Sequence, residues 1–292
     1  MWSRNKLPTI EDVDFLEKLK NSGYSFIFTF FNLIEAVQYE NMRKVSETAN
    51  FMENLNYQWI LTSHERKILE INNIKCQLLH NKNILSDEFP FTKDFTKLIM
   101  PTADAVILND FIRAKSILEK INILKQFRGM DMRNENLARI LPIWMDQNKN
   151  AQKQHPTGQM HKEAVKTLYN NKLAELIISN PNKIQIEPNK LEQLLTHIKE
   201  NNVSIPSFTI QFYIEHEMLR NTNMKWESND IADLEQSTVI PYTALTVLDK
   251  NFYSFVKQTI RKYPQLYNDK NHLVAGSIKE LRNNYRKFNK NK

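Results

Sequence analysis

Glycine is scarce in this chain, with 4 in 292 residues. Long helices tolerate this scarcity, whereas tight turns and close approaches of the backbone to phosphate groups depend on glycine. Neither a phosphate-binding loop nor a dinucleotide-binding fingerprint can be written with these glycines, so both classes are excluded. The abundance of leucine, isoleucine, lysine, glutamate and asparagine favours long helices instead.

Cysteine and long apolar runs are also lacking. Cys76 is the single cysteine, which excludes a disulfide within the chain, and no secretory apolar region follows the charged start of the sequence. We therefore expect a reducing, cytoplasmic setting. The longest apolar stretch runs from Tyr24 to Ile34 and is closed by Glu35, short of the roughly 20 residues that cross a bilayer. No membrane partner is expected.

Negative charge is the less abundant sign, and the formal net charge is +7. A positive excess favours an anionic partner such as RNA. The segment 279–292 is strongly basic and contains Arg282, Arg286 and Lys287, with Tyr285 among them. These cations are candidate contacts to an RNA backbone, and the alternative is a solvated terminal helix.

Helical spacing of apolar residues extends through most of the chain, for example in "FIRAKSILEKINILKQF" and "FTIQFYIEHEMLR". Two short aromatic or β-branched runs predict strands instead, at residues 24–31 and 242–248. Neither run alternates polar with apolar residues, as expected when helices cover both faces of a parallel sheet. The polar stretch 145–162 predicts an exposed loop. The sequence thus predicts a helix-rich α/β protein with a small parallel sheet.

Acidic residues follow both predicted strands. Glu35 lies shortly after the first strand, at the beginning of a helix, and Asp249 follows the second strand directly. Ligands of open α/β sheets collect beyond the carboxyl ends of the strands, so both acids are expected at one crevice. Asp233, in the first turns of the helix before the second strand, is a third candidate. Carboxylates that converge there would bind Mg²⁺ or Mn²⁺, which activates water for phosphodiester hydrolysis.

At these residues the chain resembles the PIN-domain family, metal-dependent nucleases with a small parallel α/β sheet. "FIFTFFNLIEAV" matches the strand and Glu-bearing helix of that family. "NDIADLEQSTVIPYTALTVLDKNF" resembles a pattern found in a subset of larger PIN-like proteins. The resemblance implies a discontinuous PIN-like core at residues 1–75 and 206–292, interrupted by an all-helical insertion at residues 76–205.

The resemblance also implies an endoribonuclease site. Glu35, Asp233 and Asp249 would be its catalytic residues and metal ligands, and Asp230 would be an additional ligand or would support the others. Lys250 would contact a substrate phosphate. RNA is the partner that follows, and a toxin-like role with an antitoxin or another protein partner is left open.

The sequence departs from the family pattern in three places. Ala244 and Leu248 stand where polar residues often accompany the final Asp. A PIN domain also opens with a strand that ends in Asp, commonly written D-x-N-x-W, and "MWSR" matches only the end of that motif. Either the missing Asp lies upstream of Met1, or the chain is a relative without catalytic activity.

Each acid also has a structural interpretation. Asp230 and Asp233 suit the positive N-terminal end of a helix, and Asp249 suits the turn after a buried strand. Lys250 can be an ordinary exposed lysine. On this interpretation the chain is a non-catalytic, helix-rich protein that binds RNA or another protein regardless of EDTA. The two hypotheses differ in whether Glu35, Asp233 and Asp249 meet at one place.

Overall fold

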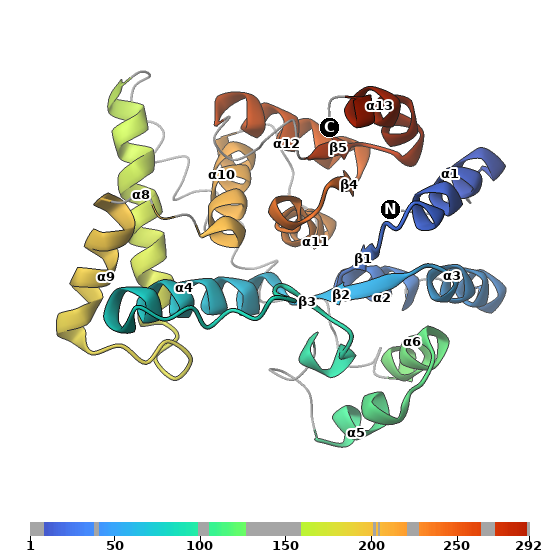
Figure 1. Cartoon of the computed structure of the whole chain (residues 1–292), viewed down its shortest axis with the longest axis horizontal. Helices are drawn as coiled ribbons and strands as arrows, with labels where there is room; N and C mark the ends of the chain where they lie inside the picture. Colours follow the sequence, from blue (N-terminus) through green and yellow to red (C-terminus); the bar gives the residue numbers. More distant parts are fainter. Residues whose placement is uncertain are drawn as a thin grey trace.

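Helices dominate the architecture, with two small sheets near the centre (Figure 1). The computed structural model describes residues 9–37, 41–98, 105–126, 159–200, 203, 205–220, 228–263 and 272–290. In chain order, the elements of these ranges are α1 (Ile10–Asn21), β1 (Phe26–Phe28), α2 (Phe30–Val37), α3 (Met42–Asn54), β2 (Tyr57–Ile60), α4 (Ser63–His80), β3 (Phe91–Thr92), the 3₁₀ helix η1 (Phe95–Leu98), α5 (Ala105–Arg113), α6 (Ile117–Gln126), α8 (Gln159–Ile178), α9 (Pro188–Glu200), α10 (Pro206–Arg220), α11 (Ser228–Ser237), the 3₁₀ helix η3 (Ile240–Tyr242), β4 (Leu245–Val247), α12 (Lys250–Lys262), β5 (Leu273–Ala275) and α13 (Ile278–Lys290).

The strands form one mixed sheet and one parallel sheet. β1 pairs in parallel with β2, with Phe26 opposite Tyr57, and β3 adds to β2 in the antiparallel direction. β4 and β5 form the parallel pair, with Leu245 opposite Leu273. Among the described strands, none pairs with the outer edge of β1 or of β4. The predicted α/β class is confirmed, but the strands are divided between two sheets.

Both predicted strands are present but shorter than expected. β1 covers only the middle of the predicted 24–31 because the next helix begins early. Asn32 accepts hydrogen bonds from the backbone N–H (2.8 Å) and the hydroxyl (3.2 Å) of Thr29, which is one half of a capping box. β4 is shortened at its start, where Pro241 occupies the first turn of η3.

The predicted loop at 145–162 ends earlier than expected. Residues 145–158 lie outside the described residues, but α8 already begins at Gln159. The residues after Gly158 include glutamine, methionine and lysine, which are good helix formers despite their polar neighbours.

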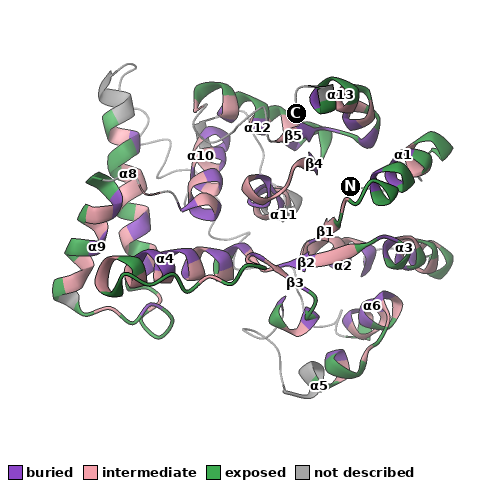
Figure 2. Ribbon diagram, in the orientation of Figure 1, coloured by how far each residue is buried: buried purple, intermediate pink, exposed green. Residues whose placement is uncertain are grey.

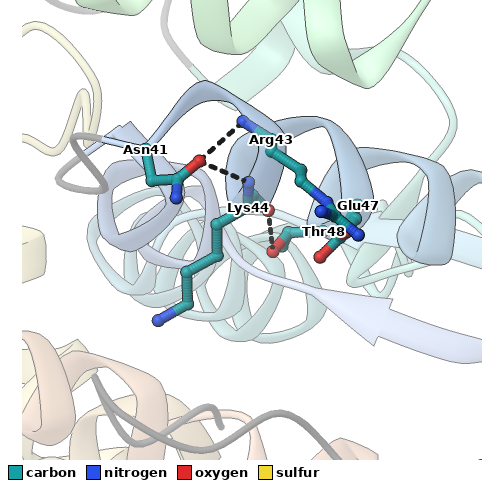
Figure 3. Close-up of polar contacts among 5 residues, drawn as sticks. All are labelled: Asn41, Arg43, Lys44, Glu47 and Thr48. Carbon is teal, nitrogen blue, oxygen red and sulfur yellow. Dashed lines mark hydrogen bonds and ion pairs between the residues drawn. The ribbon is translucent and has the colours of Figure 1, made fainter.

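Local capping fixes where α3 begins, as Figure 3 shows. Asn41 Oδ1 accepts hydrogen bonds from the backbone N–H groups of Arg43 (2.9 Å) and Lys44 (3.4 Å). One turn later, Arg43 Nε forms an ion pair with Glu47 (2.8 Å), and Thr48 donates its hydroxyl proton to the Lys44 carbonyl (2.8 Å). α3 then leads directly into β2.

Four apolar clusters hold these elements together, and their members form the inward faces in Figure 2. The first packs α2 and α3 on β1 and β2 and includes α5 and α6. The second packs α8 and α9 against α4 and the start of α10. The third joins α10, α11 and α12 to β5. The helices of the predicted insertion at 76–205 are therefore divided between the sheet-centred first cluster and the separate second cluster.

The fourth cluster brings the two sheets together beneath α1 and α13. Its buried members come from α1, α13 and β5. Phe26 of β1 packs against it, as do Leu245 and Val247 of β4. β1 and β4 thus share one apolar support, and the residues that follow them are brought into one region (Figure 1).

Candidate acidic site

Asp233 on α11 is the centre of the candidate site. Its pKa is raised to about 7, first by burial and then by the negative charges of Asp249, Glu35 and Asp230. Carboxylates act on one another in this way when they lie near one another in a partly desolvated region. Asp249, Glu35 and Asp230, the other acids that the sequence singled out, therefore all lie within electrostatic range of Asp233.

Glu35 reaches the site from α2. Its Oε1 accepts a hydrogen bond of 3.3 Å from Gln236 Nε2, and Gln236 is only 8% exposed. Gln236 follows Asp233 by three residues, so the two side chains lie on the same face of α11. This contact places the carboxylate of α2 against the acidic face of α11.

Asp249 reaches the site from the end of β4, where it is the N-cap of α12. Its Oδ1 accepts a hydrogen bond of 2.8 Å from the backbone N–H of Asn251. The preceding Leu248 is buried, which fixes the point where the chain leaves the sheet. Asp249 is exposed, and its capping role, where only a turn was predicted, is combined with an electrostatic effect on Asp233.

The acids of the candidate site do not form an enclosed metal centre. In the described part of the chain, no three His, Cys, Asp or Glu side chains are close enough to hold a metal ion together. Mg²⁺ commonly keeps several waters and uses only one or two carboxylates directly, so acids at longer range still contribute charge and hydrogen bonds to its water shell. The assignment of these acids as metal ligands stays a prediction.

A buried polar network beneath α11 was missed by sequence reasoning. Arg66 on α4 is only 1% exposed, and its guanidinium donates to the Leu61 carbonyl (2.7 Å) and to Ser207 Oγ (3.1 Å). It also donates to the hydroxyl of Thr238, just after α11. The Arg66 side chain thus connects α4, α10 and the end of α11. The available signal was the spacing of Arg66 and Glu70, one helical turn apart on the same face of α4 as the apolar Ile74.

Glu70 and Tyr242 complete this network around Ser207. The backbone N–H (3.2 Å) and hydroxyl (3.1 Å) of Ser207 donate to Glu70, and the Tyr242 hydroxyl lies 3.0 Å from Ser207 Oγ. Burial raises the pKa of Glu70 to about 7, although the hydrogen bonds from Ser207 and the charge of Arg66 oppose this shift. Tyr242, part of the motif that resembles PIN-like proteins, therefore has a structural role.

Removal of the Tyr242 hydroxyl is expected to cost a measurable part of the stability. Tyr242→Phe keeps the ring beside Arg66 but removes the contact to Ser207, so the free energy of unfolding should fall by about 1 kcal/mol. Urea denaturation measures this change. Tyr213→Phe is the matched control, because that ring packs against Tyr263 at a tilted angle and keeps this contact without its hydroxyl. An equal loss in both variants would contradict a role for the contact with Ser207.

The predicted RNA-contacting cations lie in different environments. Arg282 forms ion pairs with Glu11 (2.7 Å) and Asp12 (3.4 Å), which join α13 to α1. Arg286 and Lys287 are exposed on α13, and Lys250 is exposed at the start of α12. Arg282 thus has a structural role, and contact of any of these residues with RNA stays a prediction.

Comparisons with known proteins return no matching family model, no similar curated protein and no similar solved structure. None of the helices in the described ranges combines the length and the apolar character of a membrane span.

Proposed function

We propose that this chain is a PIN-like, metal-dependent ribonuclease in which Glu35, Asp233 and Asp249 bind Mg²⁺ or Mn²⁺. The observation that carries the proposal is the approach of two acids to Asp233 on α11: Glu35 from α2, which follows β1, and Asp249 from the N-terminus of α12, which follows β4. Ligands of α/β proteins collect beyond the carboxyl ends of strands, and these acids follow strands of two sheets that share one apolar cluster. Asp230 adds negative charge to the same place.

The proposed chemistry assigns different tasks to the ion and to the acids. A divalent ion, when bound, would supply an activated water and would offset negative charge on the phosphodiester. Asp233, in its deprotonated form, Glu35, whose carboxylate contacts Gln236, and Asp249, at a fixed helix start, would hold the ion. Lys250, exposed beside Asp249, is in a suitable position to meet a substrate phosphate.

The outer edges of β1 and β4 support the PIN-like relationship. Leu273 donates its N–H to the Ala244 carbonyl, and Leu248 donates its N–H to the Ala275 carbonyl, so the backbone groups of alternate residues of β4 face away from β5. β1 has a corresponding outer edge opposite β2. A strand that carries the acid of the D-x-N-x-W motif and pairs with both edges would join the two sheets.

Cleavage of single-stranded RNA in the presence of Mn²⁺ tests the proposal. Both the chain that starts at Met1 and a version extended by the codons upstream of it are incubated with Mn²⁺, and EDTA is added to matched samples. The proposal predicts EDTA-sensitive cleavage, stronger in the extended version if that version supplies an Asp. RNA that stays intact with both proteins would reject it.

Mn²⁺ binding is expected to strengthen as the pH rises to about 7 and to level off above. Asp233 keeps its proton below its raised pKa of about 7, and a metal ligand must be deprotonated. Displacement of one proton predicts affinity that rises about tenfold per pH unit below this point. Titration calorimetry at several pH values measures the slope. Asp233→Asn should abolish it, whereas an unchanged slope would exclude Asp233 as the titrating ligand.

The stability of the metal-free protein should fall as the pH rises, whereas Mn²⁺ affinity rises. The native state binds a proton at Asp233 that the unfolded chain, with its ordinary pKa of 3.8, has already released. The contribution of Asp233 to stability is therefore lost as the pH rises from about 4 to about 7. Metal binding should compensate for this loss at neutral pH.

A non-catalytic RNA-binding protein is the second candidate. The observation that favours it is the absence, within the described residues, of three acids close enough to hold a metal ion together. This function predicts RNA binding that is unaffected by EDTA and by Asp233→Asn. Mn²⁺-dependent cleavage separates it from the nuclease.

A further inference from the structure

Positive charge is concentrated in the last part of the chain. Residues 250–292 contain 11 Lys or Arg and 2 Asp or Glu, whereas the whole chain has a formal charge of +7. Residues 1–249 therefore carry slightly more negative than positive charge. The elements that the structure describes in the basic segment are α12, β5 and α13. A polyanion attracted by charge would meet the molecule at these elements.

One face of α12 carries a row of cations. Lys250, Lys257 and Arg261 lie on this face, because residues seven and four positions apart align along a helix. Ser254 lies between the first two, and we call these four residues the α12 stripe. All four are exposed, and the outer side of α12 is coloured accordingly in Figure 2. The opposite face of α12 is buried in the third apolar cluster, so packing directs the stripe towards solvent.

Acids of the described residues do not neutralise the α12 stripe. α12 contains no Asp or Glu, and within the described ranges none of the three cations of the stripe takes part in an ion pair. The ammonium nitrogen of Lys257 lies 5.6 Å from the centre of the Tyr253 ring instead. By contrast, Lys262 beside the stripe forms an ion pair with Glu217. The stripe therefore keeps its charge for an anionic partner.

The exposed side chains of α12 favour a phosphate backbone over other anionic partners. They are all polar, namely Lys250, Asn251, Ser254, Lys257, Gln258, Arg261 and Lys262. A helix binds a bilayer surface through an apolar face, and stable protein interfaces are centred on aromatic or other large anchoring side chains in pockets. Cations, amides and hydroxyls are instead the groups that contact phosphate and sugar oxygens.

The α12 stripe is long enough for several phosphates and begins beside the candidate site. With a helical rise of about 1.5 Å per residue, Lys250 and Arg261 are about 16 Å apart along the helix axis, which spans several phosphates of one strand. Lys250 follows Asp249 directly. A polymer bound along the stripe would therefore pass the carboxyl end of β4.

We propose that the α12 stripe binds the phosphate backbone of single-stranded RNA. This inference rests on the proposed function for the identity of the polymer, but it requires neither a metal ion nor cleavage. It adds Lys257 and Arg261 to the predicted RNA contacts and extends them from Lys250 along one helix.

The salt dependence of RNA binding in EDTA tests the proposal on the full chain. Fluorescence anisotropy measures the affinity for a labelled oligouridylate over a series of KCl concentrations. Each phosphate contact on a single strand contributes about 0.7 to the slope of log affinity against log salt. Lys257→Gln/Arg261→Gln should therefore weaken binding at low salt and make this slope shallower by about 1.4. The charge-preserving Lys257→Arg/Arg261→Lys should keep the wild-type slope.

Lys93→Gln/Lys97→Gln is the matched control. It removes the same charge from two exposed lysines. These lie at and just before η1, which packs in the first apolar cluster, whereas α12 packs in the third. The control variant should keep the wild-type slope and affinity. Thermal unfolding of all variants verifies that each is folded.

An unchanged slope in Lys257→Gln/Arg261→Gln, or an equal change in the control, would overturn the role of the α12 stripe and leave the nuclease proposal standing. The same holds if Lys257→Gln/Arg261→Gln loses affinity for phosphatidylserine vesicles or polyglutamate but binds RNA as the wild type does, since the stripe would then serve a membrane or an acidic protein. The predicted slopes without Mn²⁺-dependent cleavage would support the stripe and overturn only the nuclease. A wild-type protein that binds no RNA would overturn both.

Discussion

Asp249→Asn is expected to lower Mn²⁺-dependent RNA cleavage by about 100-fold or more. The substitution removes one negative charge and little else. Asparagine is as good an N-cap as aspartate, so its side-chain oxygen can still accept the hydrogen bond from Asn251 that begins α12. The loss of activity should therefore appear without a comparable loss of stability, as measured by initial cleavage rates and thermal unfolding of the same preparation.

Asp94→Asn is the control for this prediction. Asp94 also accepts a hydrogen bond of 2.9 Å from a backbone N–H two residues later, that of Thr96, and it is exposed. Its charge does not contribute to the shift of the Asp233 pKa. Asp94→Asn should leave cleavage unchanged. If Asp249→Asn cleaves RNA at the wild-type rate, Asp249 serves only as the N-cap of α12.

Arg66→Met is expected to lower the free energy of unfolding by about 3 to 5 kcal/mol. Methionine fills part of the space but cannot donate to the Leu61 carbonyl, Ser207 or Thr238. The Glu70 carboxyl also loses a neighbouring positive charge in a buried place. Urea denaturation measures the change, with the dependence of the unfolding free energy on urea concentration held common to both proteins.

Arg43→Met is the reference substitution for the loss of stability in Arg66→Met. Arg43 forms its ion pair with Glu47 on the surface of α3, where such pairs contribute about 0 to 1 kcal/mol (Figure 3). The double variant Arg66→Met/Glu70→Leu should recover part of the loss, because it removes the buried acid together with its cation. Equal effects of Arg66→Met and Arg43→Met would contradict a central role for the network.

Local patterns in the sequence predicted much of the fold near the site. The apolar run before Glu35 and the run before Asp249 both contain strands, since short aromatic and β-branched segments bounded by polar residues have few other stable arrangements. β2, β3 and β5 were not predicted. They have four residues or fewer, too few to display a period that separates strand from helix.

Contacts between distant segments were beyond sequence reasoning. α5 and α6 lie within the stretch assigned to an insertion, yet Phe111 and Ile121 pack in the same core as β1, because an amphipathic helix does not reveal which apolar surface it will cover. Arg66 and Thr238 are 172 residues apart, and nothing local in either segment indicates that they meet in a buried place. A buried arginine is recognisable only once its partners are known.

The sequence nominates the acids of the candidate site but does not give their detailed arrangement. The rule that ligands gather beyond parallel strands brought Glu35 and Asp249 together, and the helix before β4 added Asp233. The separation of their carboxylates depends on side-chain contacts such as that of Gln236, which no spacing rule contains. Arg282 shows the same limit, because its ion pairs with α1 depend on how α13 packs.

The sharing of one cation by these carboxylates is tested most directly by locating Mn²⁺ in crystals of the full chain through its anomalous scattering. The expected result is a single strong peak bounded by Glu35, Asp233 and Asp249, bound to their oxygens directly or through its waters. A well-occupied Mn²⁺ elsewhere on the molecule, with these three side chains directed away from one another, would contradict it.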